Sequence, residues 1–342
     1  MDHRVLGRTG VRVSPLCLGA MMYGAWGGQG YDESLPQIRA ALEAGINFID
    51  TADVYSDGES EEIVGRALAE TGMREQVVLA TKAHAQMGEG VNRSGNSRRW
   101  IIQEVENSLR RLRTDWIDLY QIHRPDPTTD IDETLGALTD LVRAGKVRYI
   151  GSSTFLAHQI VEAQWAAERR GRERFVTEQP PYSLLARGIE AEVLPVCERY
   201  GMGVLSWSPL AGGWLSGRYR AGQTPTSRRA ARLPDRYDLS LPENQRKLAA
   251  TEQFAKLAEQ AGLTLIELAL AFVLHHRAVT SVIIGPRTME HLASQLTAAD
   301  VILDADLLDS IDEIVPPGVN INPADAGWQP PALADPALRR RR

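Results

Sequence analysis

The sequence predicts an α/β fold, a (β/α)₈ TIM barrel, because short apolar runs alternate with segments of helical spacing along most of its 342 residues. The candidate strands are eight runs rich in β-branched and other apolar residues: 16–19, 46–49, 77–80, 117–122, 147–150, 175–177, 202–205 and 281–284. Strands that alternate with helices form a parallel sheet, and strands this apolar fit a sheet buried on both faces. Eight units favour closure into a barrel, and an open doubly wound sheet is the alternative.

Helical spacing follows each of several candidate strands. Apolar residues recur there every three or four positions, which places one apolar stripe on one face of a helix. This spacing predicts helices over 34–44, 59–70, 98–112 and 131–143. Glycines stand where the ends of helices would need a left-handed residue: Gly45, Gly72, Gly145 and Gly201. Asp130 is expected to cap the N-terminus of the helix over 131–143.

Three segments fall outside the repeat. Residues 3–13 predict a β-hairpin that turns between Gly7 and Gly10 and closes the bottom of the barrel. Residues 208–242 are rich in Gly, Pro and Arg and lack sustained periodicity, so we expect a long functional loop at the C-terminal face. We therefore expect one barrel domain over residues 1–342, with a Pro-rich, partly disordered C-terminal tail over residues 316–342.

The composition excludes several classes of protein. Hydrophobic residues make up 43% and charged residues 24%, as in ordinary globular chains, and the net charge of −6 does not suit a nucleic-acid binder. No apolar run reaches the length of a membrane span. Cys17 and Cys197 cannot build a disulfide framework, which favours a reducing compartment. With no apolar signal core near the N-terminus, we expect a cytoplasmic protein that contacts neither membrane nor nucleic acid.

Polar residues close the predicted strands, at the ends that a parallel barrel gathers on one face. Asp50, Lys82 and His123 follow three consecutive strands. Neighbouring strands lie about 4.8 Å apart, so these side chains can converge. Tyr55 lies on the loop after Asp50 and can fold back over the same spot. The alternative is a structural ion pair between Asp50 and Lys82, with the other two side chains packed around it.

These four groups match the needs of carbonyl reduction. A tyrosine has a pKa of about 10 and is by itself a slow proton donor at neutral pH. A nearby ammonium stabilises the phenolate, a carboxylate holds the ammonium in place, and an imidazole can orient a carbonyl oxygen by hydrogen bonding. None of the four is a good nucleophile. The set therefore fits a reaction that needs a proton and an external hydride.

Motifs of other kinds of site are missing from the sequence. It has no G-x-G-x-x-G after a strand, no P-loop, no nucleophile elbow, and neither H-E-x-x-H nor C-x-x-C. His275 and His276 are adjacent on a predicted helix and point about 100° apart, which indicates structural roles. We therefore expect no metal site.

Two stretches around these residues resemble the signatures of the aldo-keto reductases. The first is G-I-N-F-I-D-T-A-D-V-Y over 45–55, and the second runs from S-L-R-R-L-R-T-D over 108–115 to L-Y-Q-I-H over 119–123. A third region, 283–296, matches more loosely. The likeness covers about residues 4–315.

The resemblance implies a barrel enzyme that reduces a small-molecule carbonyl with NADPH and, in reverse, oxidises an alcohol. Its catalytic tetrad would be Asp50, Tyr55, Lys82 and His123. Tyr55 would donate the proton, Lys82 and Asp50 would tune it, and the imidazole of His123 would orient the carbonyl.

The resemblance also implies a set of cofactor contacts. These are Ser153, Thr154, Gln179, Trp207, Ser208, Leu210, Gly212, Arg218, Gly285, Arg287, His291 and Gln295. Ser153 and Gln179 would bind the carboxamide, and Trp207 would stack on the nicotinamide ring. Arg218 would lie over the pyrophosphate. Arg287 beside a helix N-terminus suits a 2′-phosphate, so the expected cofactor is NADP rather than NAD.

The sequence departs from the family pattern at several of these positions. Thr154 stands where many members have asparagine. His291, Ser294 and Gln295 replace a common glutamine, an acidic residue and an asparagine. The last three would lie around the adenosine, where they bear on the choice between NADP and NAD.

Within the family the chain resembles a bacterial branch that also includes potassium-channel β-subunits. The likeness is carried by L-G-R-T-G over 6–10, L-A-G-G-W-L-S-G-R-Y over 210–219 and P-A-D over 323–325. That branch implies small aldehydes as substrates and leaves assembly into a homo-oligomer open. Candidate substrate contacts are Met22, Trp26 and Trp214.

Two other functions stay open. One is a nucleotide-sensing interaction subunit, like the channel β-subunits, in which the tetrad survives and turnover is incidental. The other is a barrel isomerase or hydrolase that uses no nicotinamide. Cofactor binding would exclude the isomerase or hydrolase, and rapid reduction of a small aldehyde would separate the reductase from the subunit.

Overall fold

Eight parallel strands form a closed barrel in the computed structural model, which describes residues 1–220, 222 and 227–341. The strands are β3 (Leu16–Gly19), β4 (Phe48–Asp50), β5 (Val78–Ala83), β6 (Ile117–Ile122), β7 (Val147–Ser153), β8 (Thr177–Gln179), β9 (Gly203–Ser206) and β10 (Val279–Ile284). They pair in chain order from β3 to β10, and β10 pairs with β3 to close the ring. The (β/α)₈ prediction is confirmed, and closure excludes the open sheet.

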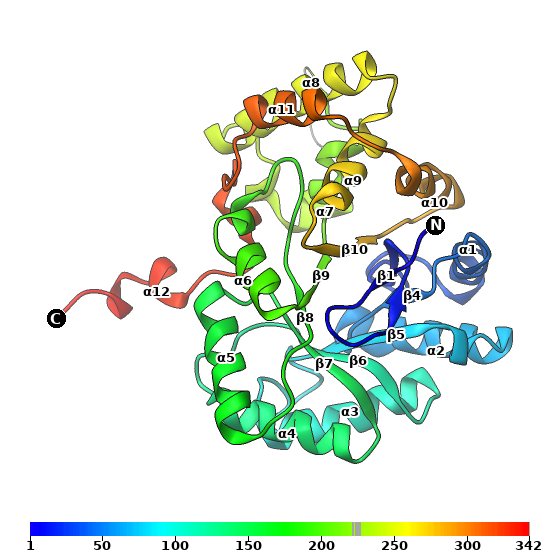
Figure 1. Ribbon diagram of the computed structural model, residues 1–342, viewed down its shortest axis with the longest axis vertical. Coiled ribbons are helices and arrows are strands. Elements are labelled where there is room, and N and C mark those ends of the chain that lie inside the picture. Colours follow the sequence, from blue (N-terminus) through cyan, green and yellow to red (C-terminus); the bar gives the residue numbers. More distant parts are fainter. Residues whose placement is uncertain (221, 223–226, 342) are drawn as a thin grey trace.

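Helices lie around the outside of the barrel (Figure 1). The longer ones are α1 (Tyr31–Glu43), α2 (Glu59–Thr71), α3 (Arg98–Leu112), α4 (Ile131–Arg143), α5 (Ala157–Arg170), α6 (Val193–Tyr200), α8 (Pro242–Gln260), α9 (Leu265–His275), α10 (Met289–Leu296) and α11 (Ala305–Ile314). The expected helix ends also form. Gly72 ends α2 in a left-handed conformation, with φ of 67°, and the Asp130 carboxylate accepts from Asp132 N at 2.9 Å to cap α4.

The N-terminal hairpin lies at the bottom of the barrel, as expected. Its strands are β1 (Arg4–Val5) and β2 (Arg12–Val13), paired antiparallel. Gly7 in its turn has φ of 55°, and a Cβ there would lie 2.7 Å from Val176 O and 2.9 Å from Gly203 N, at the starts of β8 and β9. Leu6 and Val13 are fully buried in the apolar cluster inside the barrel. The hairpin therefore closes the end opposite the candidate site.

The described residues of the loop after β9, up to 220, 222 and from 227 onward, form only short helical turns, and residues 221 and 223–226 of the predicted loop lie outside the described residues. The turns are η4 (Ala211–Ser216), α7 (Arg228–Arg232) and η5 (Pro234–Arg236). The loop is tied to the chain beyond α11 by buried charges. Asp325 accepts from Arg236 Nε at 2.7 Å and lies 2.8 Å from Lys247 Nζ on α8. These ion pairs hold the loop over the C-terminal face of the barrel.

The C-terminal segment first follows the barrel and then leaves it. Val319 O accepts from Arg187 N at 2.9 Å, and Ile321 N donates to Leu185 O at 3.1 Å. Beyond Gly327 the chain, with the short helix α12 (Pro331–Ala334), extends away from the body (Figure 1). The expectation of partial disorder over 316–342 stays a prediction, and residue 342 lies outside the described residues.

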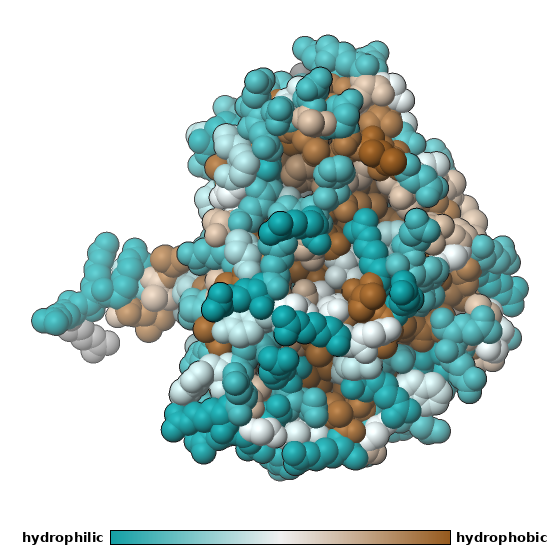
Figure 2. All heavy atoms as spheres, viewed as in Figure 1, coloured by the Kyte–Doolittle hydropathy of each residue, from teal (hydrophilic) through white to brown (hydrophobic). Residues whose placement is uncertain are grey.

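The visible surface is mostly hydrophilic, with hydrophobic residues in smaller patches between the charged ones (Figure 2). Within the described part of the chain, no single helix has both the length and the apolarity to cross a membrane. Only α8 and α9 taken together reach that length and composition, and they are bent by 93° at the break between them.

Candidate active site

Three of the four predicted catalytic side chains meet at one ammonium group. Lys82 is fully buried, and its Nζ lies 2.5 Å from Asp50 Oδ1 and 3.3 Å from the hydroxyl of Tyr55. Nζ also donates to Thr51 O at 2.7 Å. The buried ion pair that the sequence left open as a structural feature does form. It is also joined to the tyrosine hydroxyl, as the catalytic interpretation requires.

His123 completes the group. Its ring stands edge-on to that of Tyr55, with centroids 5.8 Å apart and an interplanar angle of 79°. The backbone N–H of His123 donates to Ala83 O at 3.0 Å, which continues the β5–β6 pairing past the end of β6. Burial, together with the charges of Lys82 and Arg124, holds the pKa of His123 well below its usual value. The imidazole is therefore neutral at neutral pH.

Two opposing effects act on the Lys82 ammonium. Burial by itself lowers the pKa of Lys82, but the charge of Asp50, the nearby Tyr55 and the hydrogen bonds to both outweigh it, so the pKa is raised overall. A buried lysine paired in this way keeps its proton. The site thus holds a fixed positive charge beside the hydroxyl of Tyr55.

The backbone after β4 explains how Tyr55 reaches the ammonium. Asp53 N donates to Lys82 O at 3.1 Å, so the chain stays beside β5 past the end of the strand. Directly after Tyr55 the chain turns away through Ser56 and Asp57, whose φ angles of 52° and 55° are left-handed. Such angles are strained for side chains other than glycine. The Ser56 hydroxyl offsets this strain, because it accepts from Trp26 N at 3.0 Å and donates to the backbone of the same loop.

Two glutamines, on β6 and β8, contact the Asp50 carboxylate across the inside of the barrel. Gln121 Nε2 and Gln179 Nε2 donate to Asp50 Oδ2 at 3.0 and 2.9 Å. Gln121 was not among the predicted site residues. It lies two positions before His123 on β6, so the alternation of a strand puts both side chains on the inner face, and that spacing could have identified it.

The expected nicotinamide contacts gather next to the tetrad. Ser153, at the end of β7, donates from Oγ to Gln179 O at 2.9 Å. Thr154 follows with a left-handed φ of 61°, and Trp207 directly follows β9. No described residue donates to Gln179 Oε1 or accepts from the buried Trp207 Nε1. These atoms can bind a carboxamide and line a flat ring, so the residues present fit a nicotinamide.

The expected phosphate contacts lie at the start of α10 and on the loop after β9. Burial lowers the pKa of His291, and the charges of Arg287 and Arg218 lower it further, so these three groups lie close together. Arg218 is exposed, Arg287 is half-buried, and Gln295 is buried on the same helix as His291. The remaining predicted contacts are at the edges of the same face: Ser208 with φ of 56°, Leu210, Gly212 with φ of 70°, and the exposed Gly285.

The three expected substrate contacts do not share one environment. Met22 and Trp26 are half-buried on the loop after β3, and the Trp26 ring lies 6.0 Å from that of Tyr55. Trp214 is fully buried and stacked on Tyr237, with centroids 5.8 Å apart and planes 9° from parallel. Trp214 thus packs inside the loop in this structure, and its role as a substrate contact stays a prediction.

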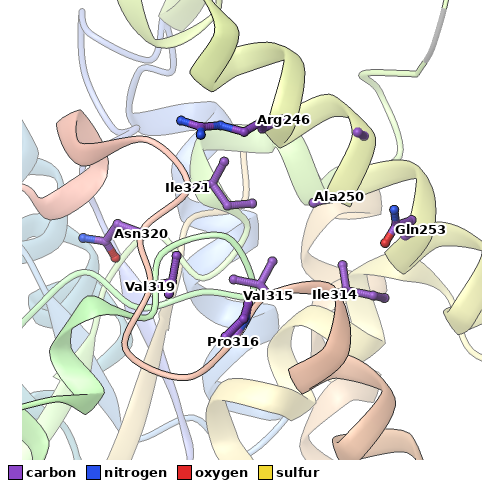
Figure 3. A pocket seen from close by; sticks show the side chains of 10 residues that line it. Arg246, Ala250, Gln253, Ile314, Val315, Pro316, Val319, Asn320 and Ile321 are labelled. Carbon is purple, nitrogen blue, oxygen red and sulfur yellow. The ribbon is translucent and has the colours of Figure 1, made fainter.

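A separate pocket lies between α8 and the chain that follows α11 (Figure 3). It has a volume of about 370 Å³ and apolar walls that include Val315, Val319 and Ile321, with Arg246 at one end. It contains none of the predicted site residues. We therefore do not assign it to the reaction.

Comparison with known proteins agrees with the fold. Residues 15–316 match the model of the Aldo/keto reductase family. An "Uncharacterized oxidoreductase YrpG" of Bacillus subtilis is 41% identical over 342 residues, covering 96% of this chain and 100% of that protein. A "Probable voltage-gated potassium channel subunit beta" of Oryza sativa is 35% identical, covering 92% and 97%. A "Versiconal hemiacetal acetate reductase" of Aspergillus parasiticus is 33% identical, covering 92% and 96%.

The barrel and these matches indicate an oxidoreductase. The chain belongs to the aldo/keto reductase family. The individual roles of the tetrad and of the cofactor contacts stay predictions, which the geometry makes specific enough to test.

Proposed function

We propose that the protein is a cytoplasmic enzyme that reduces small aldehydes or ketones to alcohols with NADPH, reversibly. One observation carries the proposal: the hydroxyl of Tyr55 lies 3.3 Å from an ammonium that is itself held 2.5 Å from a buried carboxylate. A purely structural ion pair does not need a tyrosine hydroxyl at its open end. A general acid for a carbonyl oxygen does.

The chain's own residues manage the proton. Bound NADPH supplies the hydride. Tyr55 donates its proton to the carbonyl oxygen as negative charge develops there. The Lys82 ammonium stabilises the phenolate that remains, and Asp50, fixed by two glutamine amides, keeps the ammonium in place. The neutral imidazole of His123 orients the carbonyl by a hydrogen bond without bringing a further charge.

The preference for NADPH over NADH rests on the cluster at the start of α10. A 2′-phosphate needs positive charge and hydrogen-bond donors, and Arg287, Arg218 and His291 lie together there. Thr288 caps the helix by accepting from His291 N at 3.1 Å, so the first turn of α10 is well formed. At the other end of the cofactor, Ser153 and the free Gln179 Oε1 would hold the carboxamide.

The proposal is tested by following absorbance at 340 nm with a panel of small aldehydes and ketones, with NADPH and NADH in parallel. The key variant is Tyr55→Phe, which we expect to lower kcat by about 10²- to 10⁴-fold while the Kd for NADPH stays the same. Tyr120→Phe is the matched control. Its buried hydroxyl has no partner among the described residues, so activity should be unchanged.

Two outcomes would overturn the proposal. One is a wild-type protein that binds neither dinucleotide. The other is a Tyr55→Phe variant that turns over aldehydes as fast as the wild type. A wild-type protein that works equally well with NADH would overturn only the role given to the cluster at α10.

Relatives named as potassium channel subunits support a second candidate, a nucleotide-sensing interaction subunit. Both candidates bind the dinucleotide, so turnover separates them. Steady-state kcat values above about 1 s⁻¹, at the low end of ordinary enzymes, favour the reductase. A cofactor that stays bound and reacts only once would favour the subunit, and assembly into a homo-oligomer would be expected of either.

A further inference from the structure

Arg124 is a half-buried arginine without a carboxylate partner. Its Nη1 donates to the neighbouring His123 O and lies 3.5 Å from Ser153 Oγ, and no acidic side chain of the described chain lies within ion-pair distance. Several other arginines with little exposure, among them Arg111, Arg187 and Arg236, are paired with carboxylates. Arg187, for example, lies 2.8 Å from a carboxylate oxygen of Glu190 and 2.7 Å from one of Asp312. Like the half-buried Arg4, whose guanidinium donates to two backbone carbonyls, Arg124 has no carboxylate partner in the described chain.

Glu178 is the acidic residue whose charge acts on Arg124, and its carboxylate is already hydrogen-bonded to other groups. Glu178 accepts from Ser152 Oγ at 2.5 Å and from Phe155 N at 3.1 Å. Burial raises the pKa of this carboxyl to about 7, so it is only partly ionised at neutral pH. Burial also lowers the pKa of Arg124, the direction expected for a charge that has left water without a full counterion. A charge in that position is costly unless a ligand pairs with it.

The guanidinium lies beside residues expected to bind the carbonyl and the nicotinamide. It follows His123 directly and helps to lower the pKa of that imidazole, and its Cζ is 5.8 Å from the centre of the Trp207 ring. A second cation stands at the same mouth. Arg232 lies 4.5 Å above the Trp26 ring, which packs against Tyr55. Two positive groups thus lie against side chains that neighbour Tyr55: Arg124 beside His123, and Arg232 over Trp26.

We propose that Arg124 is a specificity residue that binds an anionic group, a carboxylate or a phosphate, on the carbonyl substrate. The inference rests on the proposed reductase function and narrows its substrate class. A guanidinium offers a fork of N–H donors that matches the oxygens of either anion. The phosphates of the cofactor do not fill this role, because the groups expected to bind them, Arg218 and Arg287, gather around His291 instead.

The test compares aldehydes that differ only in the anion: 4-oxobutanoate with butanal, and glyceraldehyde 3-phosphate with glyceraldehyde. For the wild type we expect a higher kcat/KM with the anionic member of at least one pair. Arg124→Met should lower kcat/KM for the anionic substrates by about 10- to 100-fold, mainly through KM. The neutral substrates and the Kd for NADPH should change by less than about 3-fold. If Arg124→Met lowers kcat/KM more for 4-oxobutanoate, the preferred anion is a carboxylate; if it lowers kcat/KM more for glyceraldehyde 3-phosphate, the preferred anion is a phosphate.

Two further variants guard the interpretation. Arg124→Lys keeps the positive charge, so its preference for anionic aldehydes should be stronger than that of Arg124→Met. It should be weaker than that of the wild type, because an ammonium lacks the paired N–H donors of a guanidinium. Arg169→Met is the matched control, because this arginine also lies over a tryptophan, 4.9 Å from the Trp165 ring, but on the exposed face of α5. It should leave every substrate unaffected.

The results separate this inference from the function on which it rests. If the wild type turns over none of the four aldehydes and binds no dinucleotide, the proposed function fails. If it reduces them but shows no preference for charge, or if Arg124→Met slows neutral and anionic aldehydes alike, only the anion site fails. A fall in affinity for NADPH with no change in substrate preference would make Arg124 a cofactor contact and overturn the inference.

Discussion

Two buried groups of charged residues lie on opposite faces of β5. Lys82 points into the barrel and pairs with Asp50. The preceding residue, Thr81, points outward and donates to Glu61 Oε1 at 2.5 Å. Glu61 belongs to a second cluster beneath α2 and α3, in which Arg111 donates to Glu61 Oε2 at 2.6 Å and also bonds Glu104. The alternation of one strand thus separates the two clusters.

The difference between them lies in what their charges face. Glu61 and Glu104 are fully buried, and the guanidinium of Arg111 lies between them and forms an ion pair with each. In the inner cluster the ammonium has a third partner, the hydroxyl of Tyr55, at the open end of the barrel. The Arg111 cluster contacts only protein groups and fixes the helices against the sheet. The Lys82 cluster has a hydroxyl at the open end of the barrel that a ligand can reach. Loss of the cation should therefore lower stability in the first cluster and activity as well as stability in the second.

The largest effect is expected from Lys82→Met. Loss of the ammonium removes the charge that stabilises a Tyr55 phenolate, and kcat should fall by about 10²- to 10⁴-fold. The change also leaves the Asp50 carboxylate buried without its cation, which typically destabilises by about 3–5 kcal/mol. Steady-state kinetics and urea unfolding on the same preparation measure the two effects. Full activity in a folded Lys82→Met protein would contradict a catalytic role.

Arg111→Met should affect stability and leave the chemistry unchanged. The change leaves two buried carboxylates without their cation, so we expect a loss of about 3–5 kcal/mol in the free energy of unfolding. At a temperature where the variant is folded, kcat should stay within about 3-fold of the wild type. A fall in kcat as large as that of Lys82→Met would show that the two clusters are coupled across β5 and would break the comparison.

The sequence was sufficient for the barrel and for bringing three of the predicted site residues to one face, because both follow from strand order. Apolar runs locate the strands, parallel pairing brings their ends to one face, and Asp50, Lys82 and His123 each follow such a run. Tyr55 could be placed only through its motif, since it lies in the loop after β4, directly before a turn through two left-handed residues that are not glycine. Turn conformations of that kind leave no periodic signal.

The parts that the sequence missed depend on contacts between distant segments. The packing of Trp214 was not predicted, because the loop after β9 folds back on itself and stacks its ring on Tyr237. Gln121 was recognised as the end of a strand and not as a support for Asp50, because its partner lies 71 residues away. Whether Arg124 was paired could not be known without the positions of every acid around it.

Glu178 extends the comparison to a buried acid that has no arginine within ion-pair distance in the described chain. Its pKa is raised to about 7 by burial, against the ordinary value of 4.5. The folded state therefore holds this proton more tightly than the unfolded state does. Between about pH 4.5 and 7 the unfolded chain has lost the proton while the folded protein keeps it, so the free energy of unfolding falls as the pH rises through this window.

The expected size of that fall is about 3 kcal/mol, from a shift of roughly two pH units or slightly more. Urea unfolding at pH 5, 6, 7 and 8 measures it, and Glu178→Gln should remove this part of the slope because an amide does not titrate. Asp53, whose pKa is also raised by burial and by nearby acids, keeps its own contribution in both proteins. The difference between the two curves therefore reports Glu178 alone, and parallel curves would mean that its carboxyl is ionised in the folded protein at acid pH.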